Sequence, residues 1–189
     1  MTGHPHETFW VLKAQSGDRE ALDRLLRSVE GPLQGYIARL LGDAAIAEDT
    51  LQDVFAIVCR KLGWLEDARL FRPWIFRIAS REAFRRLQRE KRWSELVRDE
   101  EVLEAIRVES PPEPALDPEE LSRRIEQLSP ASRAVLILHY YHEMTLPEIA
   151  EVLGIPNGTV KSRLAYGLGR LRDSLAVGSE RSVTRGGTA

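Results

Sequence analysis

The chain has 189 residues, of which 30% are charged, and its formal net charge is −2. This length allows one large or two small domains, and the charged content is typical of a soluble protein. No stretch approaches the roughly 20 consecutive apolar residues that cross a bilayer, and the N-terminus carries no export signal. We therefore expect no membrane insertion and a cytoplasmic location.

Cys59 is the single cysteine of the chain. One cysteine cannot form an internal disulfide, which favours a reducing compartment. Cys59 follows Val58 in a helical pattern, so we interpret it as a small buried hydrophobe and not as a reactive thiol.

Charged residues are segregated along the chain. Residues 69–92 hold nine Arg or Lys and two Glu, whereas residues 94–120 hold ten Asp or Glu and two Arg. Blocks of this size indicate separate surfaces or a separate linker. A solvated helix face beside a solvated loop would explain either block alone, but it explains their pairing poorly.

The first half of the chain has the apolar spacing of amphipathic helices, and no segment shows sustained β alternation, so we predict an all-α fold. Gly17-Asp18 is a possible break in the first helical region, and Gly31-Pro32 ends that region. Asp43 caps a later helix, and residues 63–70 form a loop that holds Trp64. The predicted helical regions span residues 9–29, 33–41, 44–62 and 71–92.

The last of these helices carries one arginine every four residues: Arg77, Arg81, Arg85 and Arg89. A step of four rotates by about 40° around a helix, so these side chains form one slowly winding row, here called the arginine stripe. Like charges at this spacing repel one another by a few tenths of a kcal/mol per pair. A polyanion would convert that cost into affinity through released counterions, so we interpret the stripe as a nucleic-acid contact, widened by Arg86. Trp64 can either pack or hold an unstacked base.

Residues 93–116 are predicted to form an acidic linker. Its proline-rich part, 110–114, prevents a continuous helix, but a weak amphipathic pattern just before it leaves both a helical and an extended linker open. A second small helical domain is predicted over residues 117–175, opened by Asp117 as a cap. Residues 1–92 form the first domain, and the tail 176–189 is expected to be disordered.

Residues 144–171 are predicted to form two helices joined by a tight turn. Thr145 and Glu148 fit a capping box on the first helix, and Gly154 supplies the left-handed residue that ends it. The second helix leaves polar and cationic side chains near its N-terminus, as a helix that enters the DNA major groove requires. A helical hairpin in an unrelated protein is the plain alternative. The candidate DNA-contact residues of this helix are Asn157, Thr159, Lys161, Ser162, Arg163 and Tyr166.

Other kinds of site find little support. His139 and His142 share one helix face, but no third ligand is near in sequence, so we predict no metal site and no cofactor. The sequence has no phosphate loop, no zinc-finger spacing and no catalytic triad pattern, so we predict that the chain is not an enzyme. The acidic residues Glu48, Asp49 and Asp53 form a solvated face by default, and a protein-binding face is the sharper alternative.

The chain has a DNA-facing helical domain, an acidic linker and a second DNA-facing helical domain, in this order. This arrangement resembles the bacterial RNA polymerase sigma factors of the extracytoplasmic-function (ECF) class. Residues 47–55 resemble the family's core-binding helix, and residues 71–79 resemble its minus-ten reader. Its minus-thirty-five reader is resembled by residues 128–130, 148–150, 153–154 and 158–164. The chain departs from the family after Arg163, where several basic residues are replaced by a segment with two glycines.

The resemblance implies a transcription initiation factor that binds core RNA polymerase, recognises minus-ten and minus-thirty-five promoter elements and helps strand opening. Its implied partners are core RNA polymerase, promoter DNA and an anti-sigma factor. The implied core-polymerase contacts are Glu48, Asp49, Gln52, Asp53, Val54 and Phe55. The implied minus-ten contacts are Trp64, Arg77, Arg81, Arg85, Arg86 and Arg89, and Arg170 joins the minus-thirty-five contacts. A helix-turn-helix regulator that binds duplex DNA as a dimer, and a purely protein-binding helical module, remain as alternatives.

Overall fold

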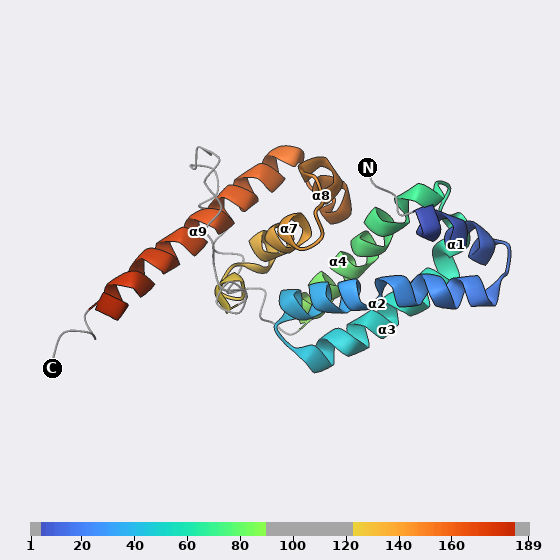
Figure 1. Ribbon diagram of the computed structural model, residues 1–189, viewed down its shortest axis with the longest axis horizontal. Helices are drawn as coiled ribbons and strands as arrows, with labels where there is room; N and C mark the ends of the chain where they lie inside the picture. The colour runs from blue at the N-terminus through green and yellow to red at the C-terminus, as the bar shows by residue number, and fades with distance from the viewer. Residues whose placement is uncertain (1–4, 90–122, 184–189) are drawn as a thin grey trace.

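The computed structural model describes residues 5–89 and 123–183, and every regular element within these ranges is helical (Figure 1). The predicted all-α fold is therefore confirmed for the described part of the chain. The expected linker 93–116 and the expected cap Asp117 lie outside the described residues. Within these ranges, none of the helices combines the length and the apolar character that a membrane span needs.

Four helices build the first body, and two 3₁₀ turns, η1 (Leu62–Trp64) and η2 (Ala68–Leu70), connect the third helix to the fourth. Its core contains Tyr36, whose hydroxyl lies 2.8 Å from the hydroxyl of Ser80. This pairing satisfies two polar groups that would otherwise be costly to bury. The four helices are α1 (Pro5–Gln15), α2 (Arg19–Leu41), α3 (Ala44–Lys61) and α4 (Phe71–Arg89).

The predicted break at Gly31-Pro32 is wrong, because α2 runs through Pro32 without ending. A proline inside a helix removes one backbone hydrogen bond. Burial offsets that cost, since one face of α2 packs into the core both before and after the proline. The buried residues of α2 are Ala21, Leu25, Val29, Leu33, Tyr36, Ile37, Leu40 and Leu41.

The interpretation of Cys59 as a buried residue is also wrong, because its side chain is exposed. Val54 and Val58 are the buried residues of that part of α3. Cys59 lies one residue, or about 100°, further around the helix, which places it outside the buried stripe. By contrast, Asp43 caps α3 as predicted, since its carboxylate accepts hydrogen bonds from the backbone N–H groups of Ala45 and Ile46.

The second body consists of α7 (Pro130–Tyr140), α8 (Leu146–Leu153) and α9 (Asn157–Val183). The predicted capping box on α8 is present: Glu148 accepts from the Thr145 N–H at 2.8 Å, and Thr145 accepts from the Glu148 N–H. Gly154 ends α8 in the left-handed conformation, with φ 67°. These local signals set the tight turn between α8 and α9, as the sequence predicts.

Helix α9 is longer than the sequence suggested. We expected a disordered tail from residue 176, but α9 continues to Val183, and its C-terminal end projects away from the other helices (Figure 1). Although Gly178 lies in this stretch, no proline does, so nothing in it blocks helical hydrogen bonding. Residues 184–189 lie outside the described ranges.

Candidate nucleic-acid interface

The arginine stripe lies along α4, opposite the face that packs into the core. Arg81, Arg85 and Arg89 are exposed, whereas Arg77 is half-buried. Arg85 pairs with Glu82 of the same helix at 3.0 Å, and Arg81 and Arg89 form no ion pair with any described residue. Buried side chains such as Ile75 fix the opposite face of α4. The stripe can therefore present at least three guanidinium groups to an anionic ligand.

Trp64 lies in η1, in the connection between α3 and α4, and 78% of its surface is exposed. The residues that flank its short turn, Leu62 and Leu65, are buried and anchor the turn to the core. Exposed tryptophan is costly in water, and a free indole face is what a base needs for stacking. The alternative that Trp64 packs in the core is therefore excluded.

The N-terminal part of α9 presents the predicted helix-turn-helix contacts. Asn157 and Lys161 are exposed, and Val160 is buried beneath them. The Ser162 hydroxyl donates to the Thr159 carbonyl at 3.0 Å, so that hydroxyl is already used within the helix. The half-buried candidates of this helix are Thr159, Ser162, Arg163 and Tyr166, and Arg170 is exposed further along.

The predicted core-binding residues do not all lie on one surface. Val54 has no exposed surface, so it belongs to the core of the first body and cannot contact a partner directly. Phe55 is half-buried against the same core. The exposed members of this predicted set are Glu48, Asp49, Gln52 and Asp53, and we call them the acidic face of α3.

Arg86 connects α4 to the acidic face. Its guanidinium lies 3.1 Å from the carboxylate of Asp53 and 3.8 Å from that of Asp49. Arg86 is thus half-buried at the edge of the arginine stripe and already paired with predicted core-polymerase contacts. Arg86 therefore links the arginine stripe to the acidic face of α3, which the sequence analysis described as separate surfaces.

The two bodies hold each other through arginines that bind helix C-termini. Arg133 of α7 donates to the carbonyl of Leu40 at 3.1 Å, and that carbonyl lies in the last turn of α2. In the opposite direction, Arg77 of α4 donates to the carbonyl of Glu151 at 2.9 Å, in the last turn of α8. Carbonyls at helix C-termini lack partners within the helix and attract cations.

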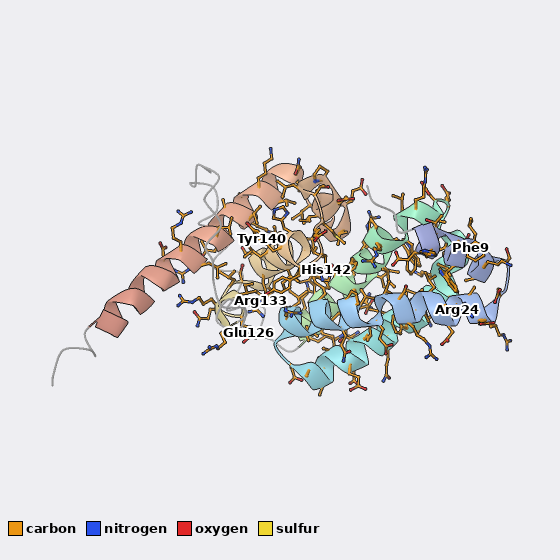
Figure 2. All side chains as sticks on the ribbon, viewed as in Figure 1. Phe9, Arg24, Glu126, Arg133, Tyr140 and His142 are labelled. Atoms are coloured by element: carbon orange, nitrogen blue, oxygen red, sulfur yellow. The ribbon has the colours of Figure 1, made fainter. Side chains whose placement is uncertain are left out.

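His142 lies at the same contact, where the second body meets α2 and α4 (Figure 2). Its ring centroid is 4.6 Å from that of Phe76 and 6.0 Å from that of Tyr36. Burial, together with the positive charges of Arg72 and Arg39, lowers the pKa of His142 to about 4. The ring is therefore neutral near pH 7 and packs as an aromatic group. Among the described residues, no group of three or more His, Cys, Asp or Glu could hold a metal ion.

Sequence reasoning missed three residues that organise this region: Arg133, His142 as an interface residue, and Gln15. Arg133 did give a signal, because it is the one cation within the apolar run from Ala131 to Leu138. It is buried, and it also donates to the carbonyls of Leu128, at 3.0 Å, and Glu126. Gln15 gave no signal, because its partners are 47 and 50 residues away in sequence.

Comparison with known proteins identifies both bodies. Residues 25–93 match the family model of sigma-70 region 2, and residues 119–171 match that of sigma-70, region 4. The ECF RNA polymerase sigma factor SigW of Bacillus subtilis is 30% identical over 178 residues, which cover 87% of this chain and 94% of SigW. The ECF sigma factor SigL of Mycobacterium tuberculosis is 36% identical over 153 residues, which cover 79% of this chain and 84% of SigL.

Solved structures agree in fold. The sigma factor RpoE from Bartonella quintana, in complex with the anti-sigma factor NepR, has a TM-score of 0.62 and 25% identity, covering 82% of this chain and 96% of that one. CnrH in complex with the cytosolic domain of CnrY has a TM-score of 0.66 at 24% identity, covering 91% of this chain and 98% of that one. With both family regions present in order and relatives matched over most of their length, this chain belongs to the ECF-class RNA polymerase sigma factors, which are transcription initiation factors.

Proposed function

We propose that this sigma factor divides promoter recognition between its two bodies. The acidic face of α3 binds core RNA polymerase, the arginine stripe and Trp64 bind the opened minus-ten strand, and the start of α9 enters the major groove of the minus-thirty-five element. The observation that carries the proposal is an exposed tryptophan in the connection that leads into α4, together with the exposed Arg81, Arg85 and Arg89 of that helix.

The minus-ten assignment is supported by the chemistry of α4. Exposed arginines every four residues can neutralise successive phosphates, and their mutual repulsion is relieved when they do so. The indole of Trp64, in the connection before α4, adds a stacking surface for one base, worth about 1–3 kcal/mol. Phosphate contacts position the strand, and the stacked base opposes its return to the duplex.

The minus-thirty-five assignment is supported by the geometry of the helix-turn-helix. Helix α8 ends at Gly154, and α9 begins at Asn157 with its polar end exposed. In proteins of this kind the N-terminal residues of the second helix contact base edges. Asn157 and Lys161 are the exposed candidates for such contacts, and Arg170 is placed to bind phosphate.

Reading both elements requires the two bodies to separate. The elements lie about 25 base pairs apart, which is roughly 85 Å along straight duplex DNA at ~3.4 Å per base pair. In the structure α8 packs directly against α4, and Arg77 of the stripe is held by Glu151. The 33 residues 90–122 could span at most about 120 Å, so the chain between the bodies is long enough for the task.

We also propose that an anti-sigma factor controls the chain. RpoE of Bartonella quintana has been solved with the anti-sigma factor NepR, and its fold covers most of this chain. A partner that favours the packed arrangement would keep Arg77 away from DNA. The proposed site of action is the cytoplasm, where core RNA polymerase meets promoter DNA.

The decisive experiment compares the wild-type protein with a double variant that carries both Arg81→Ala and Arg85→Ala. It should bind core polymerase normally and fail to open promoters, and the salt slope of minus-ten binding should fall by about 1.4 for two lost single-strand phosphate contacts. The matched control, Arg19→Ala with Arg27→Ala, removes two exposed arginines of α2 and should open promoters at the wild-type rate. Full promoter opening by the Arg81/Arg85 variant would overturn the assignment of the stripe.

A gel-shift experiment separates this proposal from a dimeric helix-turn-helix regulator. A sigma factor binds promoter DNA weakly by itself and tightly when core polymerase is added. A dimeric regulator binds its operator tightly without core polymerase. A purely protein-binding module binds DNA in neither case.

A further inference from the structure

Helix α1 holds the turn that carries Trp64. Gln15 is the last residue of α1, and its side-chain amide donates to the carbonyl of Leu62 at 2.9 Å and to that of Leu65 at 2.8 Å. An amide nitrogen has two hydrogens, and both are used here. The two accepting carbonyls flank Gly63 and Trp64, so one side chain ties both sides of the turn to a single point.

The indole of Trp64 has no comparable support of its own. Its side chain is 78% exposed, and no described aromatic ring or cation packs on it. The position of the indole therefore follows from the backbone of residues 62–65. That backbone is held by hydrogen bonds from the Leu65 N–H to the Leu62 carbonyl, at 3.1 Å, and from the Leu62 N–H to the Val58 carbonyl, and by the buried side chains of Leu62 and Leu65. Gln15 adds the side-chain contact that reaches the carbonyls on both sides of Trp64.

A second contact ties α1 to the other end of the same connection. Glu7, at the start of α1, binds the guanidinium of Arg72 in a bidentate pair with contacts of 2.8–3.0 Å. Arg72 lies at the start of α4, and Glu7 is only 7% exposed. Bidentate pairs of this kind fix orientation as well as distance. Helix α1 thus binds both ends of the connection between α3 and α4, through Gln15 at one end and Glu7 at the other.

We propose that Gln15 is a positioning residue that sets Trp64 for capture of a minus-ten base. This inference rests on the proposed function of Trp64. Gln15 contacts no DNA, and it acts by holding the turn in the conformation that the base meets. A site held in place before binding loses less conformational freedom when the ligand arrives, which raises affinity without any new contact.

The chemistry predicts an order among substitutions. Gln15→Met keeps the length of the side chain but donates no hydrogen bond, so the turn is released. Gln15→Glu keeps the shape but brings carboxylate oxygens to two carbonyl oxygens, so the turn is pushed away. Binding should therefore weaken in the order wild type, Gln15→Met, Gln15→Glu.

The test is a double-mutant cycle on the full chain with core polymerase. The probe is a fluorescent single-stranded oligodeoxynucleotide selected from a random pool by the wild-type complex. Trp64→Ala should weaken binding about 5- to 150-fold, the loss of one aromatic stack. Gln15→Met should weaken it about 2- to 10-fold, the size of one net hydrogen bond, and should have no further effect in the Trp64→Ala background. Ser16→Ala, which removes an exposed hydroxyl at the same helix end, is the matched control and should bind as wild type.

The outcomes separate the two proposals. If Trp64→Ala binds as tightly as wild type, base capture by Trp64 fails, and the role of Gln15 fails with it. If Trp64→Ala weakens binding but Gln15→Met does not, the proposed function stands and the positioning role is wrong. Equal weakening by Gln15→Met with and without Trp64 would also overturn the positioning role, because Gln15 would then act through general stability.

Discussion

Arg77 and Glu151 join the two bodies of the molecule: the Arg77 guanidinium donates to the Glu151 carbonyl at 2.9 Å. Arg77 is a member of the arginine stripe, and Glu151 lies in the first helix of the helix-turn-helix. The proposed phosphate contact of Arg77 and its contact with Glu151 draw on the same side chain. We therefore expect promoter binding and the packed arrangement to compete for it.

Arg77→Ala should shift the free protein toward separated bodies. Hydrogen bonds to charged groups contribute about 1.5–3 kcal/mol, and solvent around the half-buried Arg77 reduces this to about 1 kcal/mol, or a five-fold change in the population. Small-angle X-ray scattering should report a larger radius of gyration. Arg81→Ala, one turn further along α4, is the control and should leave the radius unchanged. Equal radii for Arg77→Ala and wild type would contradict the prediction.

His142 should make the packed arrangement sensitive to acid. Burial lowers its pKa from 6.5 to about 4, with Arg72 and Arg39 adding to the effect. Between these two values the released or unfolded form binds more protons, so stability is complete above pH 6.5 and is lost as the pH falls toward 4. At pH 5 the pKa shift alone corresponds to a loss of about 2 kcal/mol in the free energy of unfolding. Solvent screening of the partly exposed ring reduces this loss to about 1 kcal/mol.

Urea unfolding at pH 7.5 and pH 5 measures this loss. His142→Phe keeps an aromatic ring between Tyr36 and Phe76 but cannot take a proton, so its stability should fall less between the two pH values. If wild type and His142→Phe lose the same free energy of unfolding, the acid sensitivity lies elsewhere.

Two glycines of α9 should respond oppositely to alanine. A Cβ at Gly167 would lie 2.6 Å from Cδ1 and 3.3 Å from Cγ of Leu136, which is fully buried in α7. Gly167→Ala should therefore destabilise the second body by about 1–3 kcal/mol. A Cβ at Gly169 would meet nothing within 4 Å, so Gly169→Ala should stabilise the helix by about 0.5–1 kcal/mol. Thermal unfolding of the full chain measures both, and a shift of the same sign in both variants would show that Leu136 accommodates the methyl group.

Arg86 should couple core binding to DNA binding. Its ion pairs with Asp49 and Asp53 neutralise part of the acidic face of α3. Exposed pairs contribute about 0.2–1 kcal/mol, so Arg86→Ala should raise affinity for core polymerase by about 1.5- to 5-fold while lowering affinity for the minus-ten strand. Arg85→Ala is the control, because its partner Glu82 lies on α4 itself and not on the acidic face. If the affinity for core polymerase rises equally in Arg86→Ala and Arg85→Ala, the proposed role of Arg86 is wrong.

Local signals allowed much of the fold to be predicted. The caps at Asp43 and Thr145 and the left-handed Gly154 depend on neighbours within four residues, and all three are present. Predictions failed where long-range packing decides the outcome. Pro32 is carried through α2 by burial on both sides of it, which helix-breaking propensity alone does not reveal.

The candidate site divides in the same way. The exposed arginines and Trp64 follow from spacing and charge, which are visible in the sequence. The support of Trp64 does not, because Gln15 donates to carbonyls 47 and 50 residues away and its own sequence context gives no sign of this. Arg133 stands out in the sequence as a cation in an apolar run, but its partner, the carbonyl of Leu40, is visible only in the structure.

The exposed thiol of Cys59 makes the acidic face of α3 open to direct observation. Cys59 is seven residues after Gln52, so it points almost the same way from the helix, about 10 Å along its axis. Because the chain has one cysteine, a maleimide dye reacts at this position alone, without any substitution. Docking of a large protein onto α3 would bury such a dye and change its emission, which supplies a native optical probe of assembly.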